Sequence, residues 1–432
     1  MLIQFTVTVD GREVGVESRQ VSGSAAQIEE QIRQMQQRTG RMALEPVLMQ
    51  IAEQTSVPCC CRRAMESRGW RGLTVRTTFG EIPVSRRVDQ CRECGRRLSP
   101  ADAQFCCGRH RITRPLAQRI CQLVTLAHFP QLPALLANQH GVTLSHDTLI
   151  ELVHDVGGCA DRLRRADAGA SVRQRTPPKM RLDSPPRRMW ISVDGIMDCT
   201  NLRESDPDHP GHKRLAWQQM KVGCVAWEDA DGVWHKQLVW GRESPAEFGA
   251  ALWRLACRCG DVEAEEKLFA ADGGAWCWDI QARYFSDATG ILDGYHVSEH
   301  VWDAAKLVAP DHSDDWAHEA LDHLHDGGGA ALLAWLAPQI GLRRGAGRTA
   351  LENLQTYLAG QRDHVDDPAY RQRGWPIGTG RMESSCKQLV GVRLKGPGMH
   401  WTEAGALAVT ALKATDLNGQ WHSFWNTLIL SA

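Results

Sequence analysis

Two short apolar runs that each end in an aspartate constrain the fold more than any other feature of this sequence. MWISVD (189–194) and LFAAD (268–272) have the length and composition of strands buried in a sheet, because such strands are short apolar runs bounded by turn signals. MKVGCVAW (220–227) and GVWHKQLVW (232–240) lie between them and are predicted to form two further strands joined by a tight turn.

Two helices separate the later strands. Residues 244–259 have helical periodicity, with Ser244 as the N-cap and Pro245 at the first helical position. Residues 275–285 are predicted to form a second helix, and GILD (290–293) a fifth strand. The order is therefore three strands, helix, strand, helix, strand, which predicts an α/β domain with the ribonuclease H-like (retroviral integrase-like) arrangement.

Three acidic residues occupy positions where this fold brings carboxylates together. Asp194 ends the first strand and Asp272 the fourth, and these strands are neighbours in a ribonuclease H sheet, so both acids emerge at one edge. Glu383 lies in the first turn of a basic helix that begins near Gly380, and it can close the site if the intervening helical segment is an excursion from the core. For any single acid the alternative is a turn-forming or capping role.

Such a set of carboxylates suits phosphodiester chemistry. Two divalent cations about 3.5 to 4 Å apart activate the attacking oxygen and stabilise the leaving one, and Mg²⁺ prefers oxygen ligands. Each acid is followed by Gly or Ser, which leaves room for metal and phosphate. We therefore predict that Asp194, Asp272 and Glu383 bind Mg²⁺ or Mn²⁺ and are catalytic.

Charge is strongly segregated along the chain, although the net charge of its 432 residues is −1. Residues 61–119 contain fourteen Arg against five acids, and residues 162–188 nine cations against two acids. Residues 293–326 are acidic instead, with Lys306 as their one cation. Basic segments of this kind predict a polyanionic partner, and chance clustering of surface charge is the alternative.

The N-terminal part has the pattern of a zinc ribbon followed by a helix-turn-helix. Alternating runs at 73–79 and 82–88, preceded by Cys59, Cys60 and Cys61 and followed by CRECG (91–95), predict a hairpin flanked by two cysteine knuckles. Three helices follow, with Gly141 at a turn and Ser145 as the N-cap of the third. That third helix would present His146, Asp147 and Thr148 to a major groove, unless the three helices are only a packing unit.

The fifteen cysteines are an odd number in clusters, which favours thiols or metal ligands over a disulfide framework. We predict Zn²⁺ bound by Cys91, Cys94 and two of Cys59, Cys60 and Cys61, with Cys59 and Cys61 as the chosen pair. Cys106, Cys107 or His110 are substitute ligands, and a metal-free ribbon is the alternative.

Around its acids the chain resembles the DDE transposases of bacterial insertion sequences, most closely the ISKra type, which are related to Mutator-like transposases. The resemblance rests on VDGIM (193–197), ADGGAWCWD (271–279), ILDGYHVSEHVWDAAKLV (291–308) and PIGTGRMESSCKQLVGVRLKGPGMHW (376–401), and it spans 59–425. It implies a catalytic triad of Asp194, Asp272 and Glu383, Mg²⁺ as cofactor and the DNA of element ends as substrate.

The resemblance also implies a helical insert between the second and third acids, and a role for His296. Asp293-x-x-His296 is similar to a short motif that places a histidine near the scissile phosphate, whereas an ordinary loop imidazole is the alternative. One departure concerns the first knuckle, because 58–62 lacks the Cys-x-x-Cys-Gly pattern of related ribbons.

Cations accompany Glu383 along its helix. Six cations stand against one acid in 371–395, and phosphate contact is predicted for Arg381, Lys387, Arg393 and Lys395. A solvated helix face is the alternative.

These features predict a DNA transposase that binds double-stranded element ends and target DNA and acts as a homodimer or higher oligomer. A structure-selective nuclease, a catalytically silent DNA-binding regulator and a zinc-dependent interaction protein are the alternatives.

Without an apolar run of about 18 residues or a signal peptide, the sequence predicts no membrane span and a cytoplasmic location. The expected domains are a hairpin and helix (1–55), ribbon (56–110), helix-turn-helix (111–160), basic linker (161–188), core (189–297 and 374–432) and helical insert (298–373).

Overall fold

The computed structural model describes residues 1–53, 59, 61, 65–105, 108–173 and 185–428. The chain divides into two compact units. One comprises Met1–Asp161 together with the segment from Leu407 onward, and the other comprises Arg162–Ala406. The sequence-based division instead kept the last segment with the core.

The N-terminal unit begins with an antiparallel hairpin, β1 (Leu2–Val9) and β2 (Arg12–Gln20), and a long helix, α1 (Ala25–Ala52). Ser24 caps α1 through a capping box with Gln27. The predicted second hairpin is also present, as β3 (Met65–Thr77) and β4 (Gly80–Cys91), with a short third strand, β5 (Arg97–Leu98). Apolar side chains of α1 and of this sheet share one core, which fixes α1 against the hairpin: Leu48, Ala52, Leu73, Val75, Ile82 and Val84.

The three predicted helices follow a short helix, α2 (Pro100–Phe105), and are α3 (Arg114–Val124), α4 (Leu132–His140) and α5 (His146–Arg173). Gly141 ends α4 in the left-handed conformation at φ 61°. The backbone N–H of Thr148 donates to Ser145 Oγ at 3.2 Å, so the predicted N-cap of α5 is confirmed.

Helix α5 runs much farther than predicted, and the expected start of the linker was wrong. Residues 161–173 continue the helix because DRLRRADAGASVR is rich in good helix formers. The Gly157-Gly158 pair does not end it either. A Cβ at residue 157 would lie 2.4 Å from the carbonyl oxygen of Ala408, so this glycine permits close packing of α5 against α14 (Glu403–Leu417).

The second unit is built on a five-stranded sheet of order β10-β9-β6-β7-β8. Its strands are β6 (Arg188–Ser205), β7 (Lys213–Glu228), β8 (Trp234–Gly241), β9 (Glu266–Ala271) and β10 (Thr289–Leu292). Strands β6, β7 and β8 are successive antiparallel neighbours, whereas β9 lies parallel to β6 and β10 parallel to β9. The predicted strand order along the chain and the predicted pairing of the two strands that precede Asp194 and Asp272 are confirmed.

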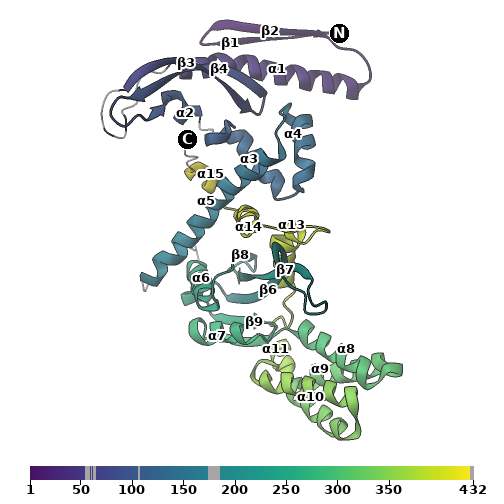
Figure 1. The fold of residues 1–432 in the computed structure, drawn as a ribbon. Coiled ribbons are helices and arrows are strands. Elements are labelled where there is room, and N and C mark those ends of the chain that lie inside the picture. Colours follow the sequence, from purple (N-terminus) through teal and green to yellow (C-terminus); the bar gives the residue numbers. More distant parts are fainter. Residues whose placement is uncertain (54–58, 60, 62–64, 106–107, 174–184, 429–432) are drawn as a thin grey trace. The chain divides into compact units, whose positions relative to one another are not determined.

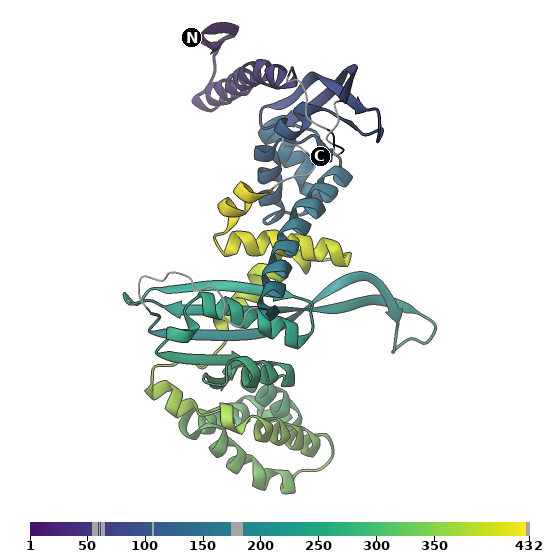
Figure 2. The ribbon, with the colours of Figure 1, turned by 90° about the vertical axis from the view of Figure 1, so that its left-hand side faces the viewer.

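Strands β6 and β7 extend beyond the sheet as a two-stranded ribbon, which Figure 2 shows projecting from the other strands. Asp194 therefore lies within β6 and does not end it, contrary to the prediction. The cause is that residues 201–205 and 213–219 are mostly polar and solvent-exposed. An apolar run therefore marks only the buried part of the strand and ends before the strand does.

Helices cover both faces of the sheet. Helices α6 (Pro245–Arg258) and α7 (Ala275–Tyr284) pack on one face in a core with Ile191, Val193 and Phe269 (Figure 1). Side chains alternate along a strand, so Trp190, Ser192 and Asp194 point to the opposite face. Helix α12 (Gly380–Cys386) lies against β6 and β7.

The segment between β10 and α12 is helical, as predicted. It contains α8 (Gly294–Val308), α9 (Ser313–Leu342), α10 (Gly345–Gly360) and α11 (Asp367–Gln372) (Figure 1). Helices α8, α9 and α10 share an apolar core that also includes Leu292 of β10. A π-helical turn (Lys387–Gly391) and α13 (Val392–Leu394) follow α12, and α15 (Trp421–Thr427) follows α14. None of the helices that the structure describes is long and apolar enough to cross a membrane.

Candidate active site

Strand register brings three aspartates to one level at the edge of the sheet. The parallel pairing of β6 with β9 runs from Arg188↔Glu266 to Ser192↔Ala270, and continuing that register by two residues sets Asp194 level with Asp272. The pairing of β10 with β9 ends at Leu292↔Ala271, so Asp293 is level with Asp272 as well. Neighbouring strands are about 4.8 Å apart, and this edge therefore concentrates negative charge.

The carboxylates of Asp194 and Asp272 are held by short-range hydrogen bonds. Asp194 Oδ1 accepts from the N–H of Gly195 at 2.6 Å, and Asp272 Oδ1 accepts from the N–H of Gly274 at 2.9 Å. Each also accepts from a buried thiol at 3.5 Å, Asp194 from Cys386 and Asp272 from Cys277.

Burial raises the pKa of Asp194, and the negative charge of Asp272 raises it further, while the hydrogen bond from Gly195 partly offsets both effects. Two like charges that disfavour each other are an arrangement that a bound cation relieves. Asp194 and Asp272 are therefore an electrostatically unfavourable pair at this edge of the sheet.

Glu383 lies on α12 with its side chain exposed, three residues before Cys386. Residues three apart share a helix face, and Cys386 donates to Asp194, so Glu383 is on the side of α12 that turns toward Asp194. Burial raises the pKa of the Cys386 thiol, and the charges of both Asp194 and Glu383 add to this effect. The helix thus joins the third acid to the first.

The three carboxylates do not converge on a single point. In the described part of the chain, one group of three or more potential ligands has all its ligand atoms within 4.8 Å of one another, and it is a cysteine cluster.

The carboxylate of Asp293 is held by hydrogen bonds from neighbouring protein groups. Its carboxylate accepts from the N–H of Tyr295 at 3.1 Å and from the N–H of Thr379 at 3.0 Å, and also accepts from the Thr379 hydroxyl. His296 Nδ1 lies 3.3 Å from its other oxygen. Although burial works in the opposite direction, the hydrogen bonds from His296 and Thr379 hold the pKa of Asp293 below its usual value.

The surroundings of His296 favour its charged form. Its hydrogen bond with Asp293 is the main cause that raises its pKa to about 9, and the charge of Asp272 contributes to the same shift. The imidazolium also acts electrostatically on Asp194. The structure therefore brings His296 close to the first two acids.

Two contacts from α10 hold the loop after Asp272, and the sequence analysis missed both. Tyr357 donates its hydroxyl to the carbonyl oxygen of Asp272 at 3.2 Å, and Gln361 Nε2 donates to the carbonyl oxygen of Gly273 at 2.9 Å. Tyr357 follows Asp272 by 85 positions and Gln361 follows Gly273 by 88, and no local pattern marks them. The buried thiols of Cys277 and Cys386 were also missed, although both stand within the motifs quoted above.

The predicted phosphate-binding cations divide into two kinds. Lys387, Lys395 and Arg381 are exposed, and the Arg381 guanidinium stacks 3.7 Å from the ring centroid of Trp234. Arg393 was wrongly placed among them, because its side chain is only 1% exposed and has no surface to offer a phosphate. The basic sequence around Arg393 gave no sign of this burial.

In the N-terminal unit the four predicted cysteines gather into one cluster. The Sγ atom of Cys59 lies 3.3 Å from that of Cys94 and 3.7 Å from that of Cys61, which is 4.0 Å from that of Cys91. A tetrahedral zinc with Zn–S bonds of about 2.3 Å needs sulfur atoms about 3.8 Å apart. Backbone N–H groups of Cys94 and Glu93 lower the pKa of Cys91 to about 7. These four cysteines could bind a structural zinc.

Among the substitute ligands, His110 is engaged elsewhere, with its Nε2 atom 2.8 Å from Asp155 Oδ2. Cys60, Cys106 and Cys107 lie outside the described residues. At the start of α5, His146 and Asp147 are exposed and Thr148 is half-buried, so the predicted groove-reading residues are accessible at the surface of this unit.

No protein-family model and no curated protein matches this chain. Among solved structures, a Drosophila P element transposase strand transfer complex is weakly similar to it over 72% of this chain and 80% of that chain, with 11% sequence identity and a TM-score of 0.26. A similarity this weak assigns neither family nor fold.

Proposed function

We propose that this chain is a DNA transposase of the DDE kind, with a ribonuclease H-like core whose catalytic carboxylates are Asp194, Asp272 and Glu383. The observation that supports it most directly is the register of β6 and β9, which sets Asp194 level with Asp272 across adjacent parallel strands. The motifs around the acids, which resemble those of ISKra-type transposases, carry the family assignment.

The sheet supports the ribonuclease H-like core. The order of elements along the chain and the adjacency of the first and fourth strands, β6 and β9, agree with what the sequence analysis predicted for that fold. Helices α8, α9 and α10 pack around an apolar core distinct from the one beneath α6 and α7, although it also includes Leu292 of β10, and this supports an insert between the second and third acids.

Asp194, Asp272 and Glu383 would hold Mg²⁺ or Mn²⁺, which when bound would activate the attacking oxygen and neutralise charge on the phosphate. Side chains of this protein would supply further positive charge to the DNA phosphates. The imidazolium of His296 would donate to a phosphate oxygen, and the exposed cations Arg381, Lys387 and Lys395 would bind the DNA backbone on either side. The N-terminal unit would recognise element ends through His146, Asp147 and Thr148, with the cysteine cluster as a zinc-stabilised support.

A set of single variants tests the proposal. Replacing Asp194, Asp272 or Glu383 by Ala should abolish Mg²⁺-dependent cleavage and joining of labelled DNA from the flanks of the coding region, while DNA binding persists. Losses should be non-additive, because an incomplete shell of ligands loses alignment and charge neutralisation together. Asp279→Ala is the control, since Asp279 is exposed on α7 and outside the site.

The outcomes separate this proposal from its rivals. Cleavage without joining would favour a structure-selective nuclease, and binding without either reaction would favour a silent regulator. Substantial Mg²⁺-dependent cleavage by the Glu383→Ala variant would remove Glu383 from the catalytic set.

A further inference from the structure

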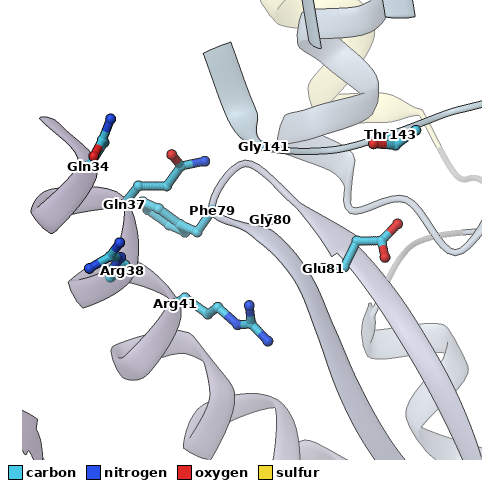
Figure 3. Close-up of a pocket in the computed structure, with 9 residues that line it drawn as sticks. All are labelled: Gln34, Gln37, Arg38, Arg41, Phe79, Gly80, Glu81, Gly141 and Thr143. Atoms are coloured by element: carbon cyan, nitrogen blue, oxygen red, sulfur yellow. The ribbon is translucent and has the colours of Figure 1, made fainter. Parts of the chain in front are cut away.

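A cleft of about 410 Å³ opens beside α1 in the N-terminal unit (Figure 3). Helix α1 forms one wall, the turn between β3 and β4 forms the floor, and the loop between α4 and α5 forms the other wall. Its lining residues include Gln37, Arg38, Arg41, Phe79, Gly141 and Thr143.

One face of α1 supplies polar and positively charged groups to this cleft. Gln37, Arg38 and Arg41 lie within about one turn of one another, so their side chains share a helix face. Arg38 is paired with Glu17 at 3.0 Å. Within the described residues Arg41 makes no ion pair, and its exposed guanidinium points into the space between α1 and the hairpin (Figure 3). Glu81 also lines the cleft, but its carboxylate is paired with Arg76 at 3.3 Å. Among the charged residues of the lining, Arg41 therefore carries the charge that no ion pair compensates.

Close packing of the residues around the cleft fixes its shape. The Phe79 ring lies against Gly40, where a Cβ would come within 2.4 Å of it. Gly141 adopts φ 61°, and a Cβ there would lie 3.0 Å from Gln37 Nε2, so the amide of Gln37 is close to the opposite wall. That wall continues through the exposed Thr143 to Ser145, the N-cap of α5.

We propose that this cleft binds a backbone phosphate of duplex DNA, with the Arg41 guanidinium, the Gln37 amide and the Thr143 hydroxyl as donors. The proposal rests on the proposed function, because it extends the DNA interface of α5 to helix α1. Arginine suits this task through its fixed fork of N–H donors. A phosphate held beside the loop that leads into His146 fixes the register in which α5 meets the base edges, since phosphate contacts position a protein and base contacts specify the sequence.

Two isosteric substitutions on adjacent residues test the inference in the full-length protein. Gln37→Glu sets a carboxylate four residues before Arg41, where it pairs with that guanidinium and repels phosphate. Gln36→Glu makes the same chemical change on the exposed, opposite face of α1. Arg41→Gln removes the cation directly, and Arg12→Gln removes an exposed cation of the β1–β2 turn that lies outside the cleft.

The measurement is affinity for a duplex of arbitrary sequence over a range of salt without Mg²⁺, because a phosphate contact is independent of sequence. Gln37→Glu and Arg41→Gln should each weaken binding roughly tenfold and reduce the slope of log affinity against log salt by about 0.9. Gln36→Glu and Arg12→Gln should leave the slope unchanged, and all four variants should melt like the wild type.

Equal salt slopes for Gln37→Glu and Gln36→Glu would overturn the inference while leaving the proposed function intact. A wild type that binds no duplex would overturn both. If inorganic phosphate alone saturates the Arg41 site and DNA affinity is unaffected by Arg41→Gln, the cleft is a site for a free anion and the DNA contact is wrong.

Discussion

Thr379 donates two hydrogen bonds to the carboxylate of Asp293, one from its backbone N–H and one from its hydroxyl. The two residues are 86 positions apart. Asp293 follows β10 at the edge of the sheet, and Thr379 is the N-cap of α12, which carries Glu383. This contact fixes the start of α12 at the edge where Asp194 and Asp272 lie, so under the proposed function Asp293 and Thr379 would position Glu383.

Thr379→Val should therefore impair chemistry more than binding. Valine keeps the shape of threonine but leaves a buried carboxylate without its hydroxyl donor, which should lower the free energy of unfolding by about 1 to 3 kcal/mol. We expect cleavage to fall by roughly one to two orders of magnitude, since small misplacements of catalytic groups cost about that much, while DNA affinity stays within about twofold.

Thr356→Val is the matched control, because Thr356 is exposed on α10 and its hydroxyl bonds only within its own helix in the described structure. Urea unfolding and cleavage assays on both variants would decide the matter. Unchanged cleavage in a destabilised Thr379→Val protein would mean that the contact is merely structural.

The raised pKa of His296 predicts how the stability of the folded protein changes with pH. Its pKa is about 9 in the folded protein against an ordinary value of 6.5, chiefly through Asp293, so the folded state binds the proton more tightly than the unfolded state. The stabilisation is fully present below about pH 6.5 and is lost as the pH rises through about 9.

Histidine NMR titration of the full chain without Mg²⁺ should find one imidazole with a pKa near 9. Asp293→Asn should return it toward its ordinary value, and added Mg²⁺ should lower it by neutralising Asp272. A His296 resonance that titrates near pH 6.5 in the wild type would contradict the ion pair.

The cysteine cluster predicts about one zinc per chain. Elemental analysis should find it in the wild type and lose it in the Cys91→Ser, Cys94→Ser double variant, because both thiolates belong to the group of four. Cys159→Ser changes a cysteine outside the cluster and should retain the metal. Zinc that persists in the double variant would relocate the site.

Much of the core could be predicted because its signals are local. The buried runs before Asp194 and Asp272 are apolar, Ser244 and Pro245 mark the start of α6, and the parallel pairing of β6 with β9 follows from the order of elements. The apolar runs and the helix start are properties of a few consecutive residues, and the pairing follows once those elements are in order; the structure contains all of them.

What was missed depends on contacts between distant segments. The hold of Tyr357 on the loop after Asp272 and the burial of Arg393 exist only after the chain folds. The continuation of α5 through Gly157 has the same origin, because a glycine pair reads as a helix end until Ala408 packs against it.

The last prediction concerns Asp198, which lies on β6 four residues after Asp194. Asp198 is fully buried, and both its carboxylate oxygens accept from Arg242 Nη2, at 2.6 and 2.7 Å. Burial raises the pKa of Asp198 and the charge of Arg242 opposes that shift.

Removing one partner of a buried ion pair leaves an uncompensated charge and costs about 3 to 5 kcal/mol. Asp198→Ala should therefore lower the free energy of unfolding by that amount, whereas Asp279→Ala should change it by less than about 0.5 kcal/mol. Chemical denaturation checks both values. Any loss of cleavage in Asp198→Ala should follow the loss of folded protein, so activity per folded molecule should stay close to that of the wild type at low temperature. A stable Asp198→Ala protein without cleavage would instead make Asp198 part of the catalytic set.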